Sequence, residues 1–338
     1  MTKWNKWIAN GIGTLALVFA IGAGAQTSEV KPFKVAYVQA KDHPHGLGAQ
    51  KFADLVAEKG GGKMTVATYG SGTLGGDAQV ISSLRGGTVD MTMVSPGLLV
   101  GLIKEFGLLD LPFLFEDYKE VDAVLDGPVG KKLLDQLPDK GLVGLGYWDH
   151  GFRNVTNSKR PITRLEDLSG LKIRVIQIPI FIEMFNAMGA NAVPMPFPEL
   201  YPALESKAVD GEENPLATVE ASKFYEVQKY ASLTQHVYNP LVTIFSKKTW
   251  DRLTPDERKI LQDAATEAGA YERRVSREGN EQAVDVLKKN GMAVNAISPA
   301  EVARMREKTK QVTDKFVKQY GEETAKEIYA EIAKVRGK

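Results

Sequence analysis

The residue whose chemistry stands out first is Arg174, in the stretch LSGLKIRVIQIP. Leu171, Ile173 and Val175 alternate onto one face, as a strand requires, and this places Arg174 on the other face. A guanidinium this deep in an apolar strand is costly to bury unless an anion meets it. Either an acidic residue elsewhere in the chain forms a structural ion pair with Arg174, or the anion is a ligand.

Other residues that could support catalysis or bind a metal do not form a complete group. His43 and His45 lie two apart in HPH, but a zinc site requires a third ligand and supporting residues, so we expect no metal and a loop near a pocket mouth. Glu212 and Glu213 in DGEEN are adjacent on an extended chain and point in opposite directions, which makes a poor hydrolytic pair. No GxSxG nucleophile motif and no cysteine occur. We therefore expect no catalytic group and no cofactor.

The stretch GSGTLGG (70–76) matches the GxGxxG spacing of dinucleotide-binding loops. However, it follows the second expected strand rather than the first. Asp90 also falls near the start of its strand, away from the end where a ribose would bind. We therefore expect a glycine-rich surface turn here and no nucleotide site.

Binding features are better represented than catalytic ones. GYWDHGFRN (146–154) places three aromatic residues, among them Trp148, beside a second arginine, Arg153. Rings that exclude water around a guanidinium are typical of a small-molecule cleft, although each ring could equally pack in the core. In PMPFPELYPAL (194–204), four prolines restrict the backbone around Phe197.

The elements that must position these residues alternate between strand and helix patterns. Such alternation implies βα units and a largely parallel sheet. A weak echo between LRGGTVD (84–90) and LESKAVD (204–210) fits two similar α/β lobes, with the first crossing near residue 150. The strands are expected at 32–40, 64–70 and 88–95, with helices at 45–59 and 77–87 between them.

The last third of the chain is helical and charged. Thr254 and Glu257 form a capping box, and the helical pattern then continues to Asn290 and the glycine after it. About 35 residues at ~1.5 Å each make a rod of about 50 Å, which is long enough to span two lobes. One further strand (292–298) and a helix capped by Ser298 follow.

The composition is that of a soluble protein. The 338 residues are 43% hydrophobic and 25% charged, which allows two lobes with separate cores. The formal net charge of +1 gives no reason to expect nucleic acid or an anionic membrane surface as a partner.

The first 25 residues have the pattern of a secretory signal peptide. Two lysines precede a short apolar run, and Ala23, Gly24 and Ala25 supply a small-residue cleavage site. We expect cleavage after Ala25, the alternative being an uncleaved N-terminal anchor. Loss of the two lysines changes the formal charge from +1 to −1. Export and the absence of cysteine predict a periplasmic, disulfide-free protein.

Four motifs together carry a resemblance to a known family: GFRNVTNSKRPI, DLSGLKIRV, PMPFPELYPAL and VDGEENPL followed by KFYEVQKY. In order and spacing they resemble the extracytoplasmic solute-binding proteins of TRAP transporters, of the dicarboxylate-binding DctP type. The resemblance covers essentially the whole mature chain. It implies a two-lobe α/β periplasmic-binding-protein fold, in which crossing strands and a long helix join the lobes and the ligand binds between them.

The resemblance also suggests lobe boundaries. These are a signal peptide at 1–25, lobe I at 26–152 with roughly 239–278 returning to it, and lobe II at 153–238 with roughly 279–338.

The resemblance implies that Arg174 pairs with the substrate carboxylate, that Arg153 and Asn214 add hydrogen bonds, and that Phe197 packs on the ligand. In the first lobe, an acid stands at the position of Ser95 in sialic-acid binders, so a sugar acid of that type is not expected here. The remaining first-lobe and specificity candidates are Gln39, Asp77, His45 and Trp148.

The function implied is capture of a small organic acid and its delivery to the membrane permease subunits of a TRAP transporter. The ligand class stays open among C4-dicarboxylates, oxo- and hydroxy-acids, uronates and aromatic acids. We expect a monomer that binds no nucleic acid. Two alternatives remain: a ligand-binding component of a sensory system, and an enzyme that acts on a carboxylate in the same fold.

Overall fold

The computed structural model describes residues 30–337, so the expected signal peptide lies outside the described residues. Within these residues one sheet has nine strands, in the order β2-β1-β3-β8-β4-β7-β5-β6, with β9 paired to β8. The short strands are β1 (Lys31–Ala36), β2 (Met64–Tyr69), β3 (Met91–Val94), β5 (Lys172–Val175), β6 (Asn191–Pro194), β7 (Gly211–Asn214) and β9 (Ala293–Ala296).

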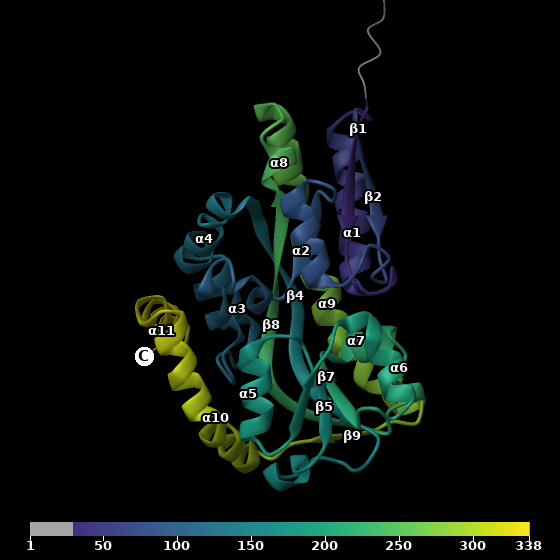
Figure 1. Cartoon of the computed structure of the whole chain (residues 1–338), viewed down its shortest axis with the longest axis vertical. Helices are drawn as coiled ribbons and strands as arrows, with labels where there is room; N and C mark the ends of the chain where they lie inside the picture. The colour runs from purple at the N-terminus through teal and green to yellow at the C-terminus, as the bar shows by residue number, and fades with distance from the viewer. Residues whose placement is uncertain (1–29, 338) are drawn as a thin grey trace, which may run out of the picture.

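Two long strands, β4 (Leu142–Asn157) and β8 (Tyr230–Ser246), connect the two ends of this sheet. They pair antiparallel along most of their length, and Figure 1 shows them running from the β1–β2 end of the molecule to the β5–β9 end. The expectation of a largely parallel sheet therefore holds at the two ends, where β1 pairs β2 and β3, and β5 pairs β6 and β7. It is wrong for the centre, because the chain crosses between the lobes twice in opposite directions.

Helices cover the faces of this sheet, in keeping with the expected alternation. In the first part of the chain these are α1 (Pro44–Lys59), α2 (Asp77–Gly86), α3 (Tyr118–Leu125) and α4 (Pro128–Leu134), with 3-10 turns η1 (Pro96–Leu99), η2 (Lys104–Asp110) and η3 (Leu137–Lys140). The middle part adds η4 (Leu165–Leu168), α5 (Pro179–Ala187), η5 (Phe197–Glu199), α6 (Leu200–Glu205), α7 (Leu216–Ala221), η6 (Phe224–Glu226) and α8 (Lys247–Trp250).

The long helix expected from the sequence is α9 (Pro255–Lys289). The Thr254 hydroxyl accepts from the Glu257 amide and the Glu257 carboxylate accepts in return, so the capping box is confirmed. The helix α9 packs on α1, β4, α7 and β9. It therefore supports both lobes.

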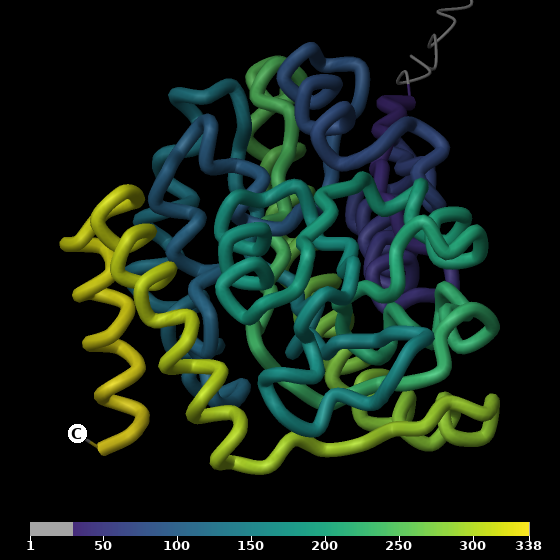
Figure 2. The backbone as a smooth tube through the Cα atoms, turned by 60° about the horizontal axis from the view of Figure 1, so that its bottom comes forward, coloured from purple at the N-terminus to yellow at the C-terminus, as the bar shows by residue number. Residues whose placement is uncertain are grey.

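The C-terminal helices α10 (Pro299–Tyr320) and α11 (Glu322–Val335) run back along one side of the molecule (Figure 2). The helix α10 packs on α5 and η2, and α11 packs on α3 and α4. Part of the segment 279–338 thus lies against the segment expected to form lobe I. The largest hydrophobic cluster likewise joins residues of both segments, including Val94, Val175 and Phe316, whereas two smaller clusters each lie within the residues of one expected lobe. The expectation of separate cores therefore holds only in part.

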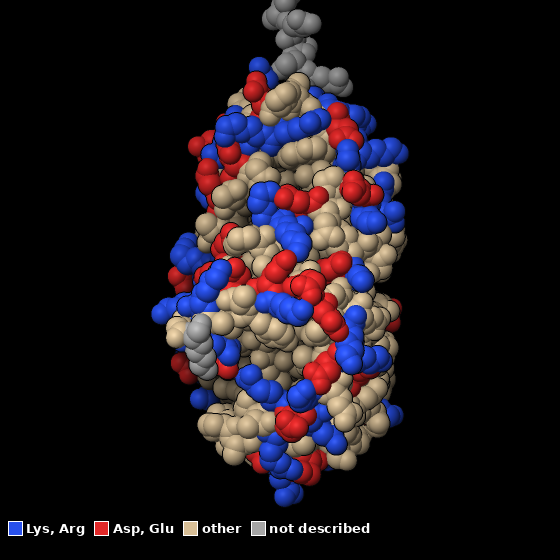
Figure 3. All heavy atoms as spheres, turned by 90° about the vertical axis from the view of Figure 1, so that its left-hand side faces the viewer, with Lys and Arg blue, Asp and Glu red and all other residues tan. Residues whose placement is uncertain are grey.

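The described surface carries both signs of charge. On the face seen in Figure 3, basic and acidic side chains are interspersed without a large area of one sign. Among residues 30–337, no helix has the length and apolar character needed to cross a membrane.

Candidate functional site

A cleft opens between the two lobes beside the ends of their parallel strands. Arg174 lies in β5, Asn214 ends β7, and Ser95 directly follows β3. Ligands of open α/β sheets bind outside the carboxyl ends of the strands, because the loops there can place side chains around a common space. The inner part of the cleft is lined by Val38, Gln39, Asp77, Met93, Val94, Ser95, His150, Arg174, Ile176, Phe197, Asn214 and Leu241.

The cleft widens outward into a pocket of about 320 Å³. Four residues belong to both parts: Asp77, Arg174, Ile176 and Phe197. The inner part alone has room for about one water molecule, at about 30 Å³. Arg174 therefore stands where the narrow inner part meets the wider outer pocket.

Arg174 is a buried cation that has no acidic partner in the described part of the chain. Its side chain is only 2% exposed, and its Nε and one terminal nitrogen donate to the Met195 carbonyl at 2.9 and 2.6 Å. The guanidinium also lies 5.8 Å from the centre of the Phe197 ring. Among the described residues, no carboxylate lies within ion-pair distance of Arg174. Desolvation lowers its pKa to about 10, which shows that burial disfavours the charged form even with Glu213 nearby.

Arg153 has the opposite environment. It is fully buried, and its Nε donates to Glu213 Oε2 at 2.5 Å, with a second bond to Oε1 at 2.9 Å. His236 lies 3.1 Å from the same carboxylate. Although burial acts to raise the pKa of Glu213, Arg153 and His236 hold it below its usual range. Arg153 also donates to Asn214 Oδ1 at 3.1 Å. It thus lies behind the cleft wall and holds Asn214 in place.

The aromatic residues beside Arg153 do not form the cleft that their composition suggested. Trp148 packs against α1 and α9 and lines a different pocket, with Gly269 and Arg273. Phe152 packs edge-on against Tyr238. The rings of this segment therefore pack in the core, which was the alternative stated above, and Trp148 does not line the space around Arg174.

The glycine-rich turn forms one wall of the outer pocket. Gly72 has φ +64° and stands so close to Pro198 that a Cβ atom would lie 2.7 Å from the proline Cγ. Asp77 follows this turn at the start of α2, and burial raises its pKa to about 6, with Arg174 acting in the opposite direction. The expected surface turn is thus also a contact between the two lobes.

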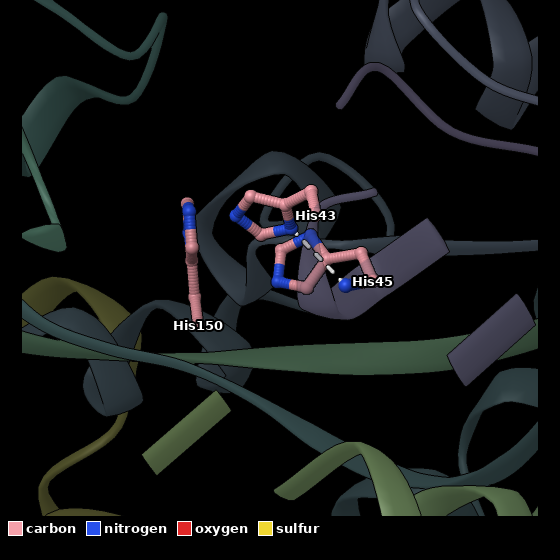
Figure 4. Close-up of side chains that lie close together, drawn as sticks. All are labelled: His43, His45 and His150. Atoms are coloured by element: carbon pink, nitrogen blue, oxygen red, sulfur yellow. Dashed lines mark hydrogen bonds between the residues drawn. The ribbon is translucent and has the colours of Figure 1, made fainter. Parts of the chain in front are cut away.

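The histidines occupy a different place from the one expected. His43, His45 and His150 each offer a ring nitrogen within 4.8 Å of the others, and all three are buried (Figure 4). The expectation of a loop near a pocket mouth is therefore wrong, because these side chains are buried together. His150 lines the inner cleft, whereas His45 lies deeper and does not.

The buried carboxylates that could have served as catalytic groups have side-chain partners. Glu212 accepts from the Thr156 hydroxyl at 2.6 Å and from the Asn214 amide, and burial raises its pKa to about 7. Glu213 faces the other way toward Arg153, as the alternation of an extended chain predicts. The two carboxyl groups therefore do not act on a common point in the cleft.

Three residues near the site were not among the candidates: Glu213, His150 and Thr218. The pair of acids in DGEEN could have indicated Glu213, because a buried Arg153 requires an acidic partner. His150 sits at a β-bulge of β4, between Asp149 and Gly151, which re-aims its side chain. Nothing in the sequence pattern marks Thr218.

The comparison with known proteins fits this geometry. Residues 35–319 match the model of the DctP family, described as bacterial extracellular solute-binding protein, family 7. The 2,3-diketo-L-gulonate-binding periplasmic protein YiaO of Escherichia coli is 39% identical over 83% of this chain and 86% of that protein. The C4-dicarboxylate-binding periplasmic protein DctP of Rhodobacter capsulatus is 33% identical over 95% and 97% of the two chains.

Solved structures share the fold over nearly their full length. The sugar acid binding protein DctPAm of Advenella mimigardefordensis, in complex with galactonate, is 46% identical with a TM-score of 0.89, over 90% of this chain and 99% of that one. A TRAP periplasmic solute-binding protein of Sulfurospirillum deleyianum with bound succinate is 32% identical with a TM-score of 0.86, over 89% and 99%. With a family match over most of its length and relatives above 30% identity, this chain belongs to the DctP family of bacterial extracellular solute-binding proteins.

Proposed function

We propose that this protein binds a sugar acid with a single carboxylate and several hydroxyl groups, and delivers it to a TRAP-type permease. The expected signal peptide, cleaved after Ala25, would export it to the periplasm as a monomer. Arg174 would hold the carboxylate, while polar side chains of both lobes would hold the hydroxyl groups.

The observation that carries this proposal is the unpaired guanidinium of Arg174 inside the cleft. A planar guanidinium fits a carboxylate with two parallel hydrogen bonds, and such pairs strengthen when water is excluded. The bonds to the Met195 carbonyl use Nε and one terminal nitrogen, so donors on the terminal nitrogens remain for a ligand. The ring of Phe197 beside the guanidinium limits the access of water to this pair.

The charges around the cleft favour one carboxylate over two. Arg174 is the single cationic residue among the residues that line the two parts of the cleft. The other nearby arginine, Arg153, is neutralised by Glu213. A second ligand carboxylate would instead approach Asp77, whose own charge repels it.

The remaining polar lining suits hydroxyl groups. Gln39, Ser95, Asn214 and His150 line the inner cleft and offer both donors and acceptors. Sugar hydroxyls donate and accept in the same way, and an ionised Asp77 would accept from two of them. The relatives named for 2,3-diketo-L-gulonate and crystallised with galactonate, at 39% and 46% identity, support this class over the succinate-bound structure at 32%.

Closure of the lobes would complete the site. Gly72 of the first lobe meets Pro198 of the second at the rim of the outer pocket. A ligand that contacts both lobes adds interactions in the closed state alone, so it shifts the population toward closure.

The test is a thermal-shift and calorimetric screen of ligand-free protein with galactonate, erythronate and succinate. A free ligand at 100 times its Kd stabilises the fold by about 2.7 kcal/mol, which is a readily measured shift. We expect the sugar acids to bind more tightly than succinate. Tighter binding of succinate would refute the single-carboxylate assignment, and absence of binding by all carboxylates would refute the anchor at Arg174.

A charge variant makes this test specific. In Asp77→Asn the repulsion of a second carboxylate is removed, so the preference for galactonate over succinate should narrow by roughly tenfold, or about 1.4 kcal/mol. Asp42→Asn, which neutralises an exposed acid, changes the net charge equally and should leave the preference unchanged. An equal effect of both variants would show that overall charge, rather than the cleft, sets the preference.

A further inference from the structure

The cluster of His43, His45 and His150 lies where both lobes and the long helix meet. His43 caps α1 and His45 lies in its first turn, whereas His150 comes from the bulge of the crossing strand β4. Figure 4 shows the three rings close together, with the bond from the His45 amide to His43 Nδ1 dashed. The rings of His43 and His45 are 4.2 Å apart, and those of His45 and His150 are 4.8 Å apart.

Two of these rings are already held together by a residue of the second lobe. The Thr218 hydroxyl, in α7, lies 3.0 Å from His43 Nε2 and 2.9 Å from His150 Nε2. On its other side His150 Nδ1 contacts Asn239 Oδ1 at 3.2 Å. With the bond from the His45 amide to His43 Nδ1, both ring nitrogens of His43 and of His150 have partners, so a cation would have to displace the Thr218 hydroxyl from their Nε2 atoms.

The third ring, His45, has polar atoms without partners. Neither of its ring nitrogens has a hydrogen-bond partner among the described residues, although the side chain is 1% exposed. Glu272 Oε1 on α9 is also buried without a partner and lies 3.9 Å from His45 Nε2. Each buried polar group left unpaired costs about 1–3 kcal/mol, so three of them at one point indicate that something else binds there.

From this geometry we propose that His43, His45 and His150 form a binding site for a divalent transition-metal cation of the Zn²⁺ class, with Glu272 as the adjacent carboxylate. Three neutral imidazoles and one carboxylate are a donor set that Zn²⁺ favours. Because Zn–N bonds are about 2.0–2.1 Å, the rings must move together by about an ångström from their present maximum separation of 4.8 Å.

The position of the site gives it a role in the fold. A bound cation would tie α1 of the first lobe to the crossing strand β4, beside α9 and next to Thr218 of the second lobe. Since His150 also lines the inner cleft, the cation would fix one wall of the ligand site.

The composition of the chain makes the test clean. The sequence has four histidines and no cysteine, and the fourth histidine, His236, is paired with Glu213. Chelator-treated protein is titrated with Zn²⁺ by calorimetry, and with Co²⁺, whose visible absorption reports nitrogen ligands and coordination number. We expect one cation per chain, a nitrogen-ligand Co²⁺ spectrum, and a rise in thermal unfolding temperature with Zn²⁺.

Variants locate the site. His45→Gln should weaken Zn²⁺ binding at least tenfold, whereas His236→Gln, which removes another buried histidine, should leave it unchanged. Circular dichroism and urea unfolding report whether each variant is folded. If wild-type protein binds no Zn²⁺ or Co²⁺ at micromolar concentration, the proposal is wrong, and water binds the unpartnered atoms of His45 and Glu272 instead. Equal binding by folded His45→Gln and wild type would also overturn it.

Discussion

Replacement of two buried arginines by methionine should affect different properties of the protein. We expect Arg153→Met mainly to lower stability and Arg174→Met mainly to weaken ligand binding. Arg153 is fully buried and bonded to Glu213 at 2.5 Å, whereas Arg174 is 2% exposed and has no acidic partner within ion-pair distance among residues 30–337. Methionine has similar reach without charge. We therefore compare Arg153→Met and Arg174→Met in ligand-free protein and in the presence of ligand.

The magnitudes follow from the two environments. Removing one partner of a buried ion pair leaves an uncompensated charge, so Arg153→Met should lower the free energy of unfolding by about 3–5 kcal/mol. In Arg174→Met an unfavourable desolvation is relieved: its pKa falls from 12.5 to about 10 on burial, which at about 1.4 kcal/mol per unit is about 3 kcal/mol. The loss of two charged hydrogen bonds to the Met195 carbonyl, about 1.5–3 kcal/mol each, acts against this gain. The net loss of unfolding free energy should therefore be about 0–3 kcal/mol, less than the loss in Arg153→Met.

For ligand affinity, we expect the larger loss in Arg174→Met and the smaller loss in Arg153→Met. Truncating one partner of a buried, hydrogen-bonded charge pair costs about 2–5 kcal/mol, so Arg174→Met should weaken galactonate binding by about 30-fold to several thousand-fold. Arg153→Met, where it stays folded, should lose less, because Arg153 acts through Asn214 rather than on the carboxylate.

The assay is urea unfolding followed by tryptophan fluorescence for stability, and calorimetry with galactonate for affinity. Both variants carry the same change in charge, so each serves as the control for the other. If Arg174→Met lowers stability as much as Arg153→Met, Arg174 is a structural cation and our interpretation of the cleft fails. If Arg174→Met binds galactonate like wild type, the carboxylate is held elsewhere.

Further predictions concern single residues. Burial raises the pKa of Asp77 to about 6, so the folded state binds more protons than the unfolded state. The free energy of unfolding should therefore fall as the pH rises from about 4 to about 6. Asp77→Asn should remove this pH dependence, as measured by urea unfolding at several pH values. In Gly72→Ala, a methyl group 2.7 Å from Pro198 and a strained φ of +64° should hinder closure and weaken galactonate binding, with less compaction by small-angle scattering on ligand addition. Trp148→Phe should leave galactonate affinity within about twofold, since this side chain lines another pocket; a larger loss by calorimetry would place it back in the site. Thr254→Ala removes the cap of α9 and should cost about 1 kcal/mol in urea unfolding, while an unchanged midpoint would show that packing alone holds this helix end.

Local features of this protein could be predicted from the sequence because they depend on neighbouring residues. The capping box at Thr254 and the length of α9 follow from i, i+3 spacing and from helical periodicity. The strand that carries Arg174, and the fact that an arginine there needs an anion, follow from alternation and from the cost of burying charge. The family motifs added the two-lobe fold and the carboxylate hypothesis.

The tertiary structure decided whatever depends on register between distant strands. Arg153 and Glu213 are 60 residues apart, and they meet because β4 pairs with β7. Three register shifts in the pairing of β4 with β8 change which side chains face the cleft, and they turn Trp148 toward α9 and His150 toward His43. A bulge of one residue exchanges the two faces of a strand, and its position depends on the partner strand, which a single segment of sequence does not contain.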